Sequence, residues 1–133
     1  MSDILALDVG KVKTGIARAS TVARLAEPLM TVPTGDVPKT LDELIKKHDV
    51  KTVVVGLPRN LNGQETDQTK WVRGWIAGLK PQLPGINFHW QDEALTTQQA
   101  AKSVGKNITE DAMAASIILQ DYLQTSQVSE VTA

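Results

Sequence analysis

Cysteine is absent from this chain of 133 residues, and only two histidines, His48 and His89, occur in it. The lack of cysteine excludes disulfide bonds, thiolate metal sites and cysteine nucleophiles. Two histidines are too few for a three-histidine zinc site. Any bound metal ion must therefore be held mainly by oxygen ligands, which select hard cations such as Mg²⁺ or Mn²⁺.

The sequence also lacks long apolar runs and a positively charged N-terminus. No apolar run approaches the roughly 18 residues of a membrane span. The first three residues, Met1-Ser2-Asp3, include none of the basic residues that open a secretory signal. We therefore expect a cytoplasmic protein without a membrane partner.

Neither sign of charge is in large excess, since 14 basic and 15 acidic residues give a net charge of −1. Nucleic-acid-binding proteins are usually basic, so this total argues mildly against that class. The distribution is less even, because residues 11–24 contain Lys11, Lys13, Arg18 and Arg24 and no acidic residue. These side chains form either a solvated surface or a contact for phosphate groups.

Length and apolar patterning predict one α/β domain over residues 1–124, followed by a polar, disordered tail over 125–133. Strands are expected at residues 4–7, 14–19, 29–32, 51–56 and 86–90. Helices are expected to begin near Pro38, at Thr66 or Asp67, at Thr96 and at Thr109. A hairpin meander followed by strand–helix alternation favours a ribonuclease H-like fold. Its five-stranded mixed sheet has three antiparallel strands, two parallel strands and helices on both faces.

Four carboxylates stand where such a sheet would gather a site. Asp8 ends the first strand, Asp92 and Glu93 end the fifth, and Asp111 lies in the first turn of the last helix. Neighbouring residues of a strand face opposite ways, so only one of Asp92 and Glu93 can face the site. Taken singly, each acid has an ordinary explanation as a turn residue, a solvated loop residue or a helix N-terminal acid.

The combination of these acids is more informative than each acid alone. Three carboxylates that converge repel one another unless a cation lies between them. A cluster of acids without histidine or cysteine suits Mg²⁺ or Mn²⁺, and pairs of such ions promote phosphodiester hydrolysis. The residue types therefore favour a metal-dependent nuclease.

Several motifs closely resemble those of the YqgF/RuvX family, whose members are candidate Holliday junction resolvases and candidate pre-16S rRNA nucleases. The resemblance spans residues 4–123 and implies a ribonuclease H-like nuclease. The motifs are Leu7-Asp8-Val9-Gly10, Gly15-Ile16-Ala17, Gly56-Leu57-Pro58-Arg59-Asn60-Leu61-Asn62-Gly63, Asp92-Glu93-Ala94-Leu95-Thr96-Thr97 and Asp111-Ala112-Met113-Ala114-Ala115.

The resemblance assigns catalytic and metal-binding roles to Asp8, Glu93 and Asp111, with Asp92 as the alternative to Glu93. Asn60 and Gly63 match a loop beside the site, where polar groups could meet phosphate. Basic side chains complete the expected substrate contacts: Lys11, Lys13, Arg59, Lys70 and Arg73.

Two departures from the family pattern concern the grip on the substrate. Ala94 stands where the family has arginine, and residues 102–109 form a shorter and less basic loop. An arginine at the first position could hold a carboxylate or phosphate through two hydrogen bonds. We therefore expect a weaker grip, or a partner that supplies part of it.

The expected function is metal-dependent processing of the 5′ end of precursor 16S rRNA, with a Holliday junction resolvase as the alternative. A non-catalytic RNA-binding module is disfavoured, because acids beside a phosphate groove weaken binding unless metal neutralises them. Sugar kinases and actin-like ATPases also begin with Asp-x-Gly, but they bind ATP between two lobes, and this chain is long enough for only one.

Expected partners are precursor rRNA, branched DNA and the ribosomal particle. The chain is expected to act as a monomer or a homodimer, and a symmetric junction would call for a dimer.

Overall fold

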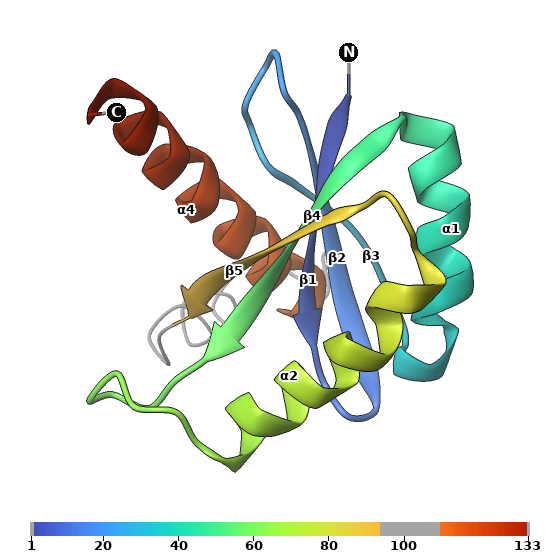
Figure 1. Ribbon diagram of the computed structural model, residues 1–133, viewed down its shortest axis with the longest axis vertical. Coiled ribbons are helices and arrows are strands. Elements are labelled where there is room, and N and C mark those ends of the chain that lie inside the picture. The colour runs from blue at the N-terminus through green and yellow to red at the C-terminus, as the bar shows by residue number, and fades with distance from the viewer. Residues whose placement is uncertain (1, 94–109, 133) are drawn as a thin grey trace.

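The computed structural model describes residues 2–93 and 110–132 (Figure 1). The sequence correctly predicted the order of strands and helices over these residues. The helix expected to begin at Thr96 lies outside the described residues. The main elements are β1 (Asp3–Val9), β2 (Lys13–Ser20), β3 (Glu27–Pro33), α1 (Val37–His48), β4 (Val50–Pro58), α2 (Asp67–Leu79), β5 (Asn87–Glu93) and α4 (Glu110–Thr132).

The five strands form one mixed sheet in the order β3-β2-β1-β4-β5. The first three strands pair in antiparallel fashion, whereas β4 and β5 are parallel additions next to β1. β1 is therefore the central strand, and its carboxyl end lies at the same edge of the sheet as the ends of β4 and β5. This is the arrangement predicted from the sequence.

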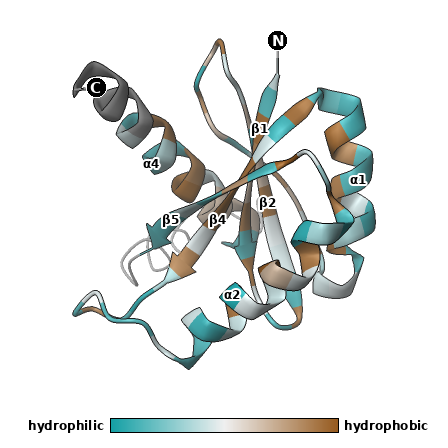
Figure 2. Cartoon of the chain, in the orientation of Figure 1, coloured by the Kyte–Doolittle hydropathy of each residue, from teal (hydrophilic) through white to brown (hydrophobic). Residues whose placement is uncertain are grey.

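Helices cover both faces of the sheet, as Figure 1 shows. Leu5, Leu7 and Val9 of β1 pack with α1 and α2, whereas Ile4 and Ala6 pack with α4. The alternation follows from the period of two in a strand, and both sets are apolar because both faces are covered. Hydrophobic residues accordingly line the central strands, while outward positions of α1 and α2 are hydrophilic (Figure 2).

The connection from β4 to α2 is held by threonines. Thr66 caps α2 in a reciprocal arrangement with Thr69, which confirms one of the two predicted caps. The buried Thr69 hydroxyl also donates a hydrogen bond to the carbonyl of Pro58 at the end of β4. The start of α2 is therefore tied to the edge of the sheet where the acids lie.

A second threonine pair supports the turn between β1 and β2. The buried hydroxyls of Thr14 and Thr34 lie 2.9 Å apart, and Thr34 donates a 2.5 Å hydrogen bond to the carbonyl of Gly10. The Gly10 amide in turn donates to the carbonyl of Lys13 at 3.1 Å. These bonds fix the turn directly after Asp8.

Over the described residues, no helix is both long and apolar enough to cross a membrane.

Candidate active site

Asp8 and Asp111 lie together at the carboxyl end of β1. Asp8 is in phase with Ile4 and Ala6, so its side chain faces α4. Both aspartates line one cavity of about 160 Å³, here called the acid pocket, together with Gly10, Gln68 and Glu110. Two of the three acids assigned from the sequence are thus brought together.

Gly15 makes this meeting of Asp8 and Asp111 possible. It is the direct partner of Asp8 across the β1–β2 ladder. A Cβ atom at Gly15 would overlap the backbone of Asp111, including its carbonyl oxygen. The first turn of α4 therefore rests on β2 at a place where only glycine leaves enough room.

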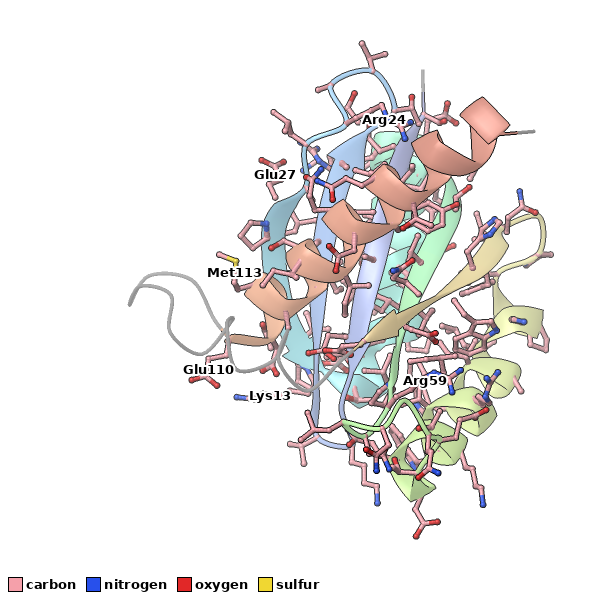
Figure 3. All side chains as sticks on the ribbon, turned by 90° about the vertical axis from the view of Figure 1, so that its left-hand side faces the viewer. Lys13, Arg24, Glu27, Arg59, Glu110 and Met113 are labelled. Carbon is pink, nitrogen blue, oxygen red and sulfur yellow. The ribbon has the colours of Figure 1, made fainter. Side chains whose placement is uncertain are left out.

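The acid pocket holds its carboxylates in mutual repulsion. Burial, followed by the charge of Asp111, raises the pKa of Asp8 from 3.8 to about 7. Lys13 offsets part of this charge, since its Nζ lies 3.5 Å from Oδ2 of Asp111. Lys13 and Glu110 lie at the same end of the sheet (Figure 3). A cation between Asp8 and Asp111 would favour the ionised form of both.

Glu93 faces the same side of the sheet as Asp8, whereas Asp92 faces the other side. A Cβ atom at Gly56 would stand 2.9 Å from Oε2 of Glu93 and 2.5 Å from Ile118 of α4. Glu93 is only 2% exposed. Asp92 is exposed and accepts a 2.8 Å hydrogen bond from Nε of Arg59. The geometry therefore favours Glu93 over Asp92 as the acid of this strand, which was the preferred sequence assignment.

Glu93 is not among the residues that line the acid pocket with Asp8 and Asp111. Within residues 2–93 and 110–132, no group of three or more His, Cys, Asp or Glu side chains is arranged to hold a metal ion. Glu93 instead lines a neighbouring cavity. A third carboxylate against Asp8 and Asp111 would add to the repulsion that already raises the pKa of Asp8. The assignment of Glu93 as a metal ligand stays a prediction.

The donor set nevertheless fits a hard divalent cation. Asp8 and Asp111 supply carboxylate oxygens in a partly buried cavity. Such oxygen ligands are those that Mg²⁺ and Mn²⁺ prefer. Asp8 and Asp111 are the residues that would hold the ion.

Three of the predicted phosphate-binding residues are engaged in ion pairs. Lys13 contacts Asp111, Arg59 contacts Asp92, and Nε of Arg73 lies 2.7 Å from Glu65. The hydrogen bond from Arg73 lowers the pKa of Glu65.

The other predicted phosphate-binding cations are exposed. Nζ of Lys11 lies 6.0 Å from the ring centre of Trp71, and Lys70 projects from α2. The five basic residues come from the β1–β2 turn, the first residue of β2, the loop after β4, and α2. Their contact with a substrate stays a prediction.

Asn60 and Gly63 shape the loop that joins β4 to α2. Oδ1 of Asn60 accepts hydrogen bonds from the backbone amides of Asn62, at 3.0 Å, and Gln64, at 2.9 Å. Gly63 has a φ of 76°, a conformation that favours glycine. Both residues therefore have a structural reason to occur in this motif, besides the predicted contact with phosphate.

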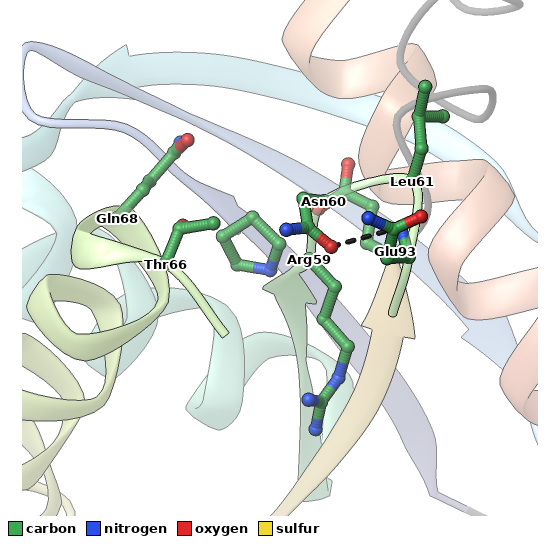
Figure 4. Close-up of a pocket in the computed structure, with 8 residues that line it drawn as sticks. Arg59, Asn60, Leu61, Thr66, Gln68 and Glu93 are labelled. Atoms are coloured by element: carbon green, nitrogen blue, oxygen red, sulfur yellow. Dashed lines mark hydrogen bonds between the residues drawn. The ribbon is translucent and has the colours of Figure 1, made fainter. Parts of the chain in front are cut away.

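A larger cavity of about 450 Å³ adjoins the acid pocket. We call it the loop pocket, and its walls are residues 58–62, Thr66, Gln68 and Glu93 (Figure 4). Gln68 lines both cavities.

The sequence alone does not identify Gln68 and Glu110 as site residues. A polar residue in the first turn of a helix is common, and only the fold shows what it faces. Ala94 and residues 102–109 lie outside the described residues.

The sequence profile of the RuvX family, described as Holliday junction resolvase, matches residues 2–125. The chain belongs to the RuvX family. Two relatives are provisionally named pre-16S rRNA nuclease. The relative from Bacteroides fragilis is 30% identical, covering 96% of this chain and 100% of the relative. The relative from Fusobacterium nucleatum is 37% identical, covering 92% and 97%.

Solved structures agree on the fold of this RuvX-family chain. RuvC of T. thermophilus in complex with a Holliday junction superposes with a TM-score of 0.56 at 13% identity, covering 96% of both chains. The Fowlpox virus resolvase in complex with junction DNA gives 0.55 at 8% identity, covering 93% of this chain and 98% of that one. These similarities confirm the ribonuclease H-like fold of the resolvases.

Proposed function

We propose that this protein is a divalent-metal-dependent nuclease that processes the 5′ end of precursor 16S rRNA. The observation that carries the proposal is the pairing of Asp8 and Asp111 in the acid pocket, where the pKa of Asp8 is raised to about 7. Two carboxylates held against their own repulsion suit a cation-binding site better than a purely structural one. The names of the relatives supply the choice of RNA.

The chemistry is hydrolysis of a phosphodiester, which leaves a phosphomonoester on one fragment and a hydroxyl on the other. Bound Mg²⁺ or Mn²⁺ would activate the attacking water and stabilise charge on the phosphate. Asp8 and Asp111 would hold the cation. Glu93 lies on the same face of the sheet and would support the cation from the neighbouring cavity. Lys13 at the start of β2 contacts Asp111, and Lys11 follows Gly10 of the acid pocket; both can position a phosphate group.

A Holliday junction resolvase is the second candidate, and the description of the matching family favours it. A junction has two equivalent cutting sites, so this function needs a homodimer, whereas trimming of an RNA end can be done by a monomer. Cytoplasmic localisation and binding to the ribosomal particle belong to the rRNA proposal.

Cleavage of matched substrates by the purified protein tests the proposal. The substrates are a precursor 16S rRNA fragment, a linear duplex and a four-way junction, each with Mg²⁺, Mn²⁺, Zn²⁺ or excess chelator. We expect cleavage of the RNA with Mg²⁺ or Mn²⁺, little with Zn²⁺ and none with chelator. An Asp8→Asn variant should lose this activity while it stays folded.

Each other outcome has a clear meaning. Symmetric nicking of the junction with intact RNA would replace the rRNA proposal by the resolvase. Full activity in chelator would contradict the metal dependence. If the wild-type protein bound the RNA without cutting it, and Asp8→Asn bound it as well or better, a non-catalytic RNA-binding module would be the correct function.

A further inference from the structure

The loop pocket is the larger of the two adjoining cavities, and of its walls only Glu93 takes part in the acid chemistry proposed above. It measures about 450 Å³, compared with about 160 Å³ for the acid pocket. Gln68 lines both cavities, so they share a rim. Because Gln68 lines both cavities, a strand whose phosphate lies at Asp8 and Asp111 can place its next nucleotide at the loop pocket.

The loop pocket is large enough for one nucleobase. Its volume lies within the range of about 300–1,000 Å³ that is typical of small-molecule sites. A base inside a duplex cannot enter such a cavity unless it is flipped out of its stack. The occupant that fits is therefore an unpaired base, or a base that is easily unpaired.

The side chains that line the loop pocket suit a nucleobase. Among the described residues, the side-chain amides of Asn62 and Gln68 take part in no hydrogen bond, unlike the amide of Asn60. Asparagine and glutamine amides pair with the donor and acceptor pattern of base edges. Pro58 and Leu61 add apolar surface for the face of a ring, and Leu61 is 73% exposed. Figure 4 shows Gln68 and Thr66 across the cavity from Leu61 and Asn60.

We propose that the loop pocket binds one unpaired nucleobase of the substrate strand, next to the phosphate that is cut, and that Asn62 and Gln68 read its edge. The inference rests on the proposed nuclease function for its ligand, and it deepens that function in two ways. It defines the substrate class as single-stranded or locally unpaired nucleic acid. It also makes Asn62 and Gln68 specificity-determining residues.

An abasic scan of the RNA substrate tests the pocket. Single abasic nucleotides replace each position near the cut site in turn, and kcat/KM is measured with Mg²⁺. We expect one position beside the cut to lose about tenfold or more in wild-type protein, the size of a good base contact. An Asn62→Ala, Gln68→Ala double variant should cut the intact RNA about tenfold more slowly, with no further loss at that position.

Matched controls separate base reading from a general loss of polar side chains. Gln124 of α4 and Asn87 of β5 are exposed and line neither cavity. Gln124→Ala and Asn87→Ala should retain the wild-type rate and the wild-type scan. If they lowered the rate as much as the pocket variants, the assignment of Asn62 and Gln68 would be wrong.

A binding measurement keeps the pocket testable when no cleavage occurs. Asp8→Asn protein is mixed with RNA that carries 2-aminopurine at single positions near the cut site, or throughout the fragment if none is known. Unstacking of one base into the pocket should raise its fluorescence, and the Asn62→Ala, Gln68→Ala changes should abolish the rise. If the protein cuts RNA, but kcat/KM is the same at every abasic position and the 2-aminopurine fluorescence does not rise, the base-binding proposal is wrong. The nuclease proposal is then unaffected. Absence of cleavage with either metal would overturn the nuclease, and the fluorescence alone would then decide the pocket.

Discussion

Asp8 and Gly15 face each other across the β1–β2 ladder, and the absence of a side chain on Gly15 brings Asp111 to Asp8. The backbone of Asp111 occupies the space that a Cβ atom at Gly15 would need. One acid of the pair is therefore placed by strand register, and the other by the close approach of α4 to a glycine.

Gly15→Ala is expected to push the first turn of α4 away from β2 and to separate Asp111 from Asp8. A shift of about 1 Å at a catalytic group can cost about 100-fold in rate, so we expect a loss of at least this size. The rate of RNA cleavage and the Mg²⁺ affinity both report it. Gly74→Ala is the control, since no atom lies within 4 Å of a Cβ atom there. Wild-type activity in Gly15→Ala would contradict the positioning role.

Glu93→Gln and Asp92→Asn form a matched pair of neighbouring substitutions. Glu93 lies on the α4 face, whereas Asp92 binds Arg59 on the other side. Changes to groups that ligate or support a metal cost about 10- to 100-fold, so we expect a loss of this size for Glu93→Gln. Asp92 faces away from α4, and exposed ion pairs contribute only about 0–1 kcal/mol to stability, so Asp92→Asn should lose less than about fivefold in cleavage rate. A larger loss in Asp92→Asn would reverse the assignment.

The alternation along β5 could have decided between Asp92 and Glu93 from the sequence alone. Phe88 and Trp90 pack on the α2 side, and Asp92 continues their phase. His89 packs against Tyr122 of α4, and Glu93 continues that phase. Strands and helices were readable because their apolar periods are local properties of the chain. The roles of Gln68 and Gly15 were not, because they depend on contacts between segments that are far apart in sequence.

The ion pairs of Arg59 and Arg73 show the same limit. Both residues are predicted as phosphate contacts, yet each has a carboxylate partner in the fold, Asp92 for Arg59 and Glu65 for Arg73. Charge pairing depends on side-chain geometry rather than on order along the chain. The sequence therefore predicts the type of site, but it cannot show which of the predicted phosphate contacts already pair with acids of the chain.

Asp8→Asn is expected to stabilise the metal-free protein, and to do so more at high pH. The folded pKa of Asp8, about 7, lies above its unfolded value of 3.8, so the folded state binds more protons between these values. Wild-type stability should therefore fall relative to Asp8→Asn by about 1.4 kcal/mol per pH unit across that interval, and level off above pH 7. The other charged groups around Asp8 are Asp111 and Glu110, which line the same pocket, and Lys13, which pairs with Asp111. Urea unfolding in chelator at pH 5 and pH 8 measures the difference. An equal gain in stability from Asp8→Asn at pH 5 and at pH 8 would contradict the raised pKa of the buried Asp8 carboxyl.

RNA binding should depend only weakly on salt. Lys11, Lys13, Arg59, Lys70 and Arg73 are the candidate phosphate contacts, and three of them already pair with acids of the chain. Each phosphate neutralised on a single strand contributes about 0.7 to the slope of log affinity against log salt. Five contacts therefore set an upper magnitude of about 3.5 for the slope, and the need to break the internal ion pairs lowers this magnitude.

The measurement uses Asp8→Asn protein and a single-stranded rRNA fragment between low and moderate salt. Lys11→Ala should reduce the slope by about 0.7, whereas Lys47→Ala on the exposed face of α1 should leave it unchanged. A slope steeper than about 5 would mean that residues beyond these five grip the strand, and it would favour the many phosphate contacts of a junction-binding resolvase.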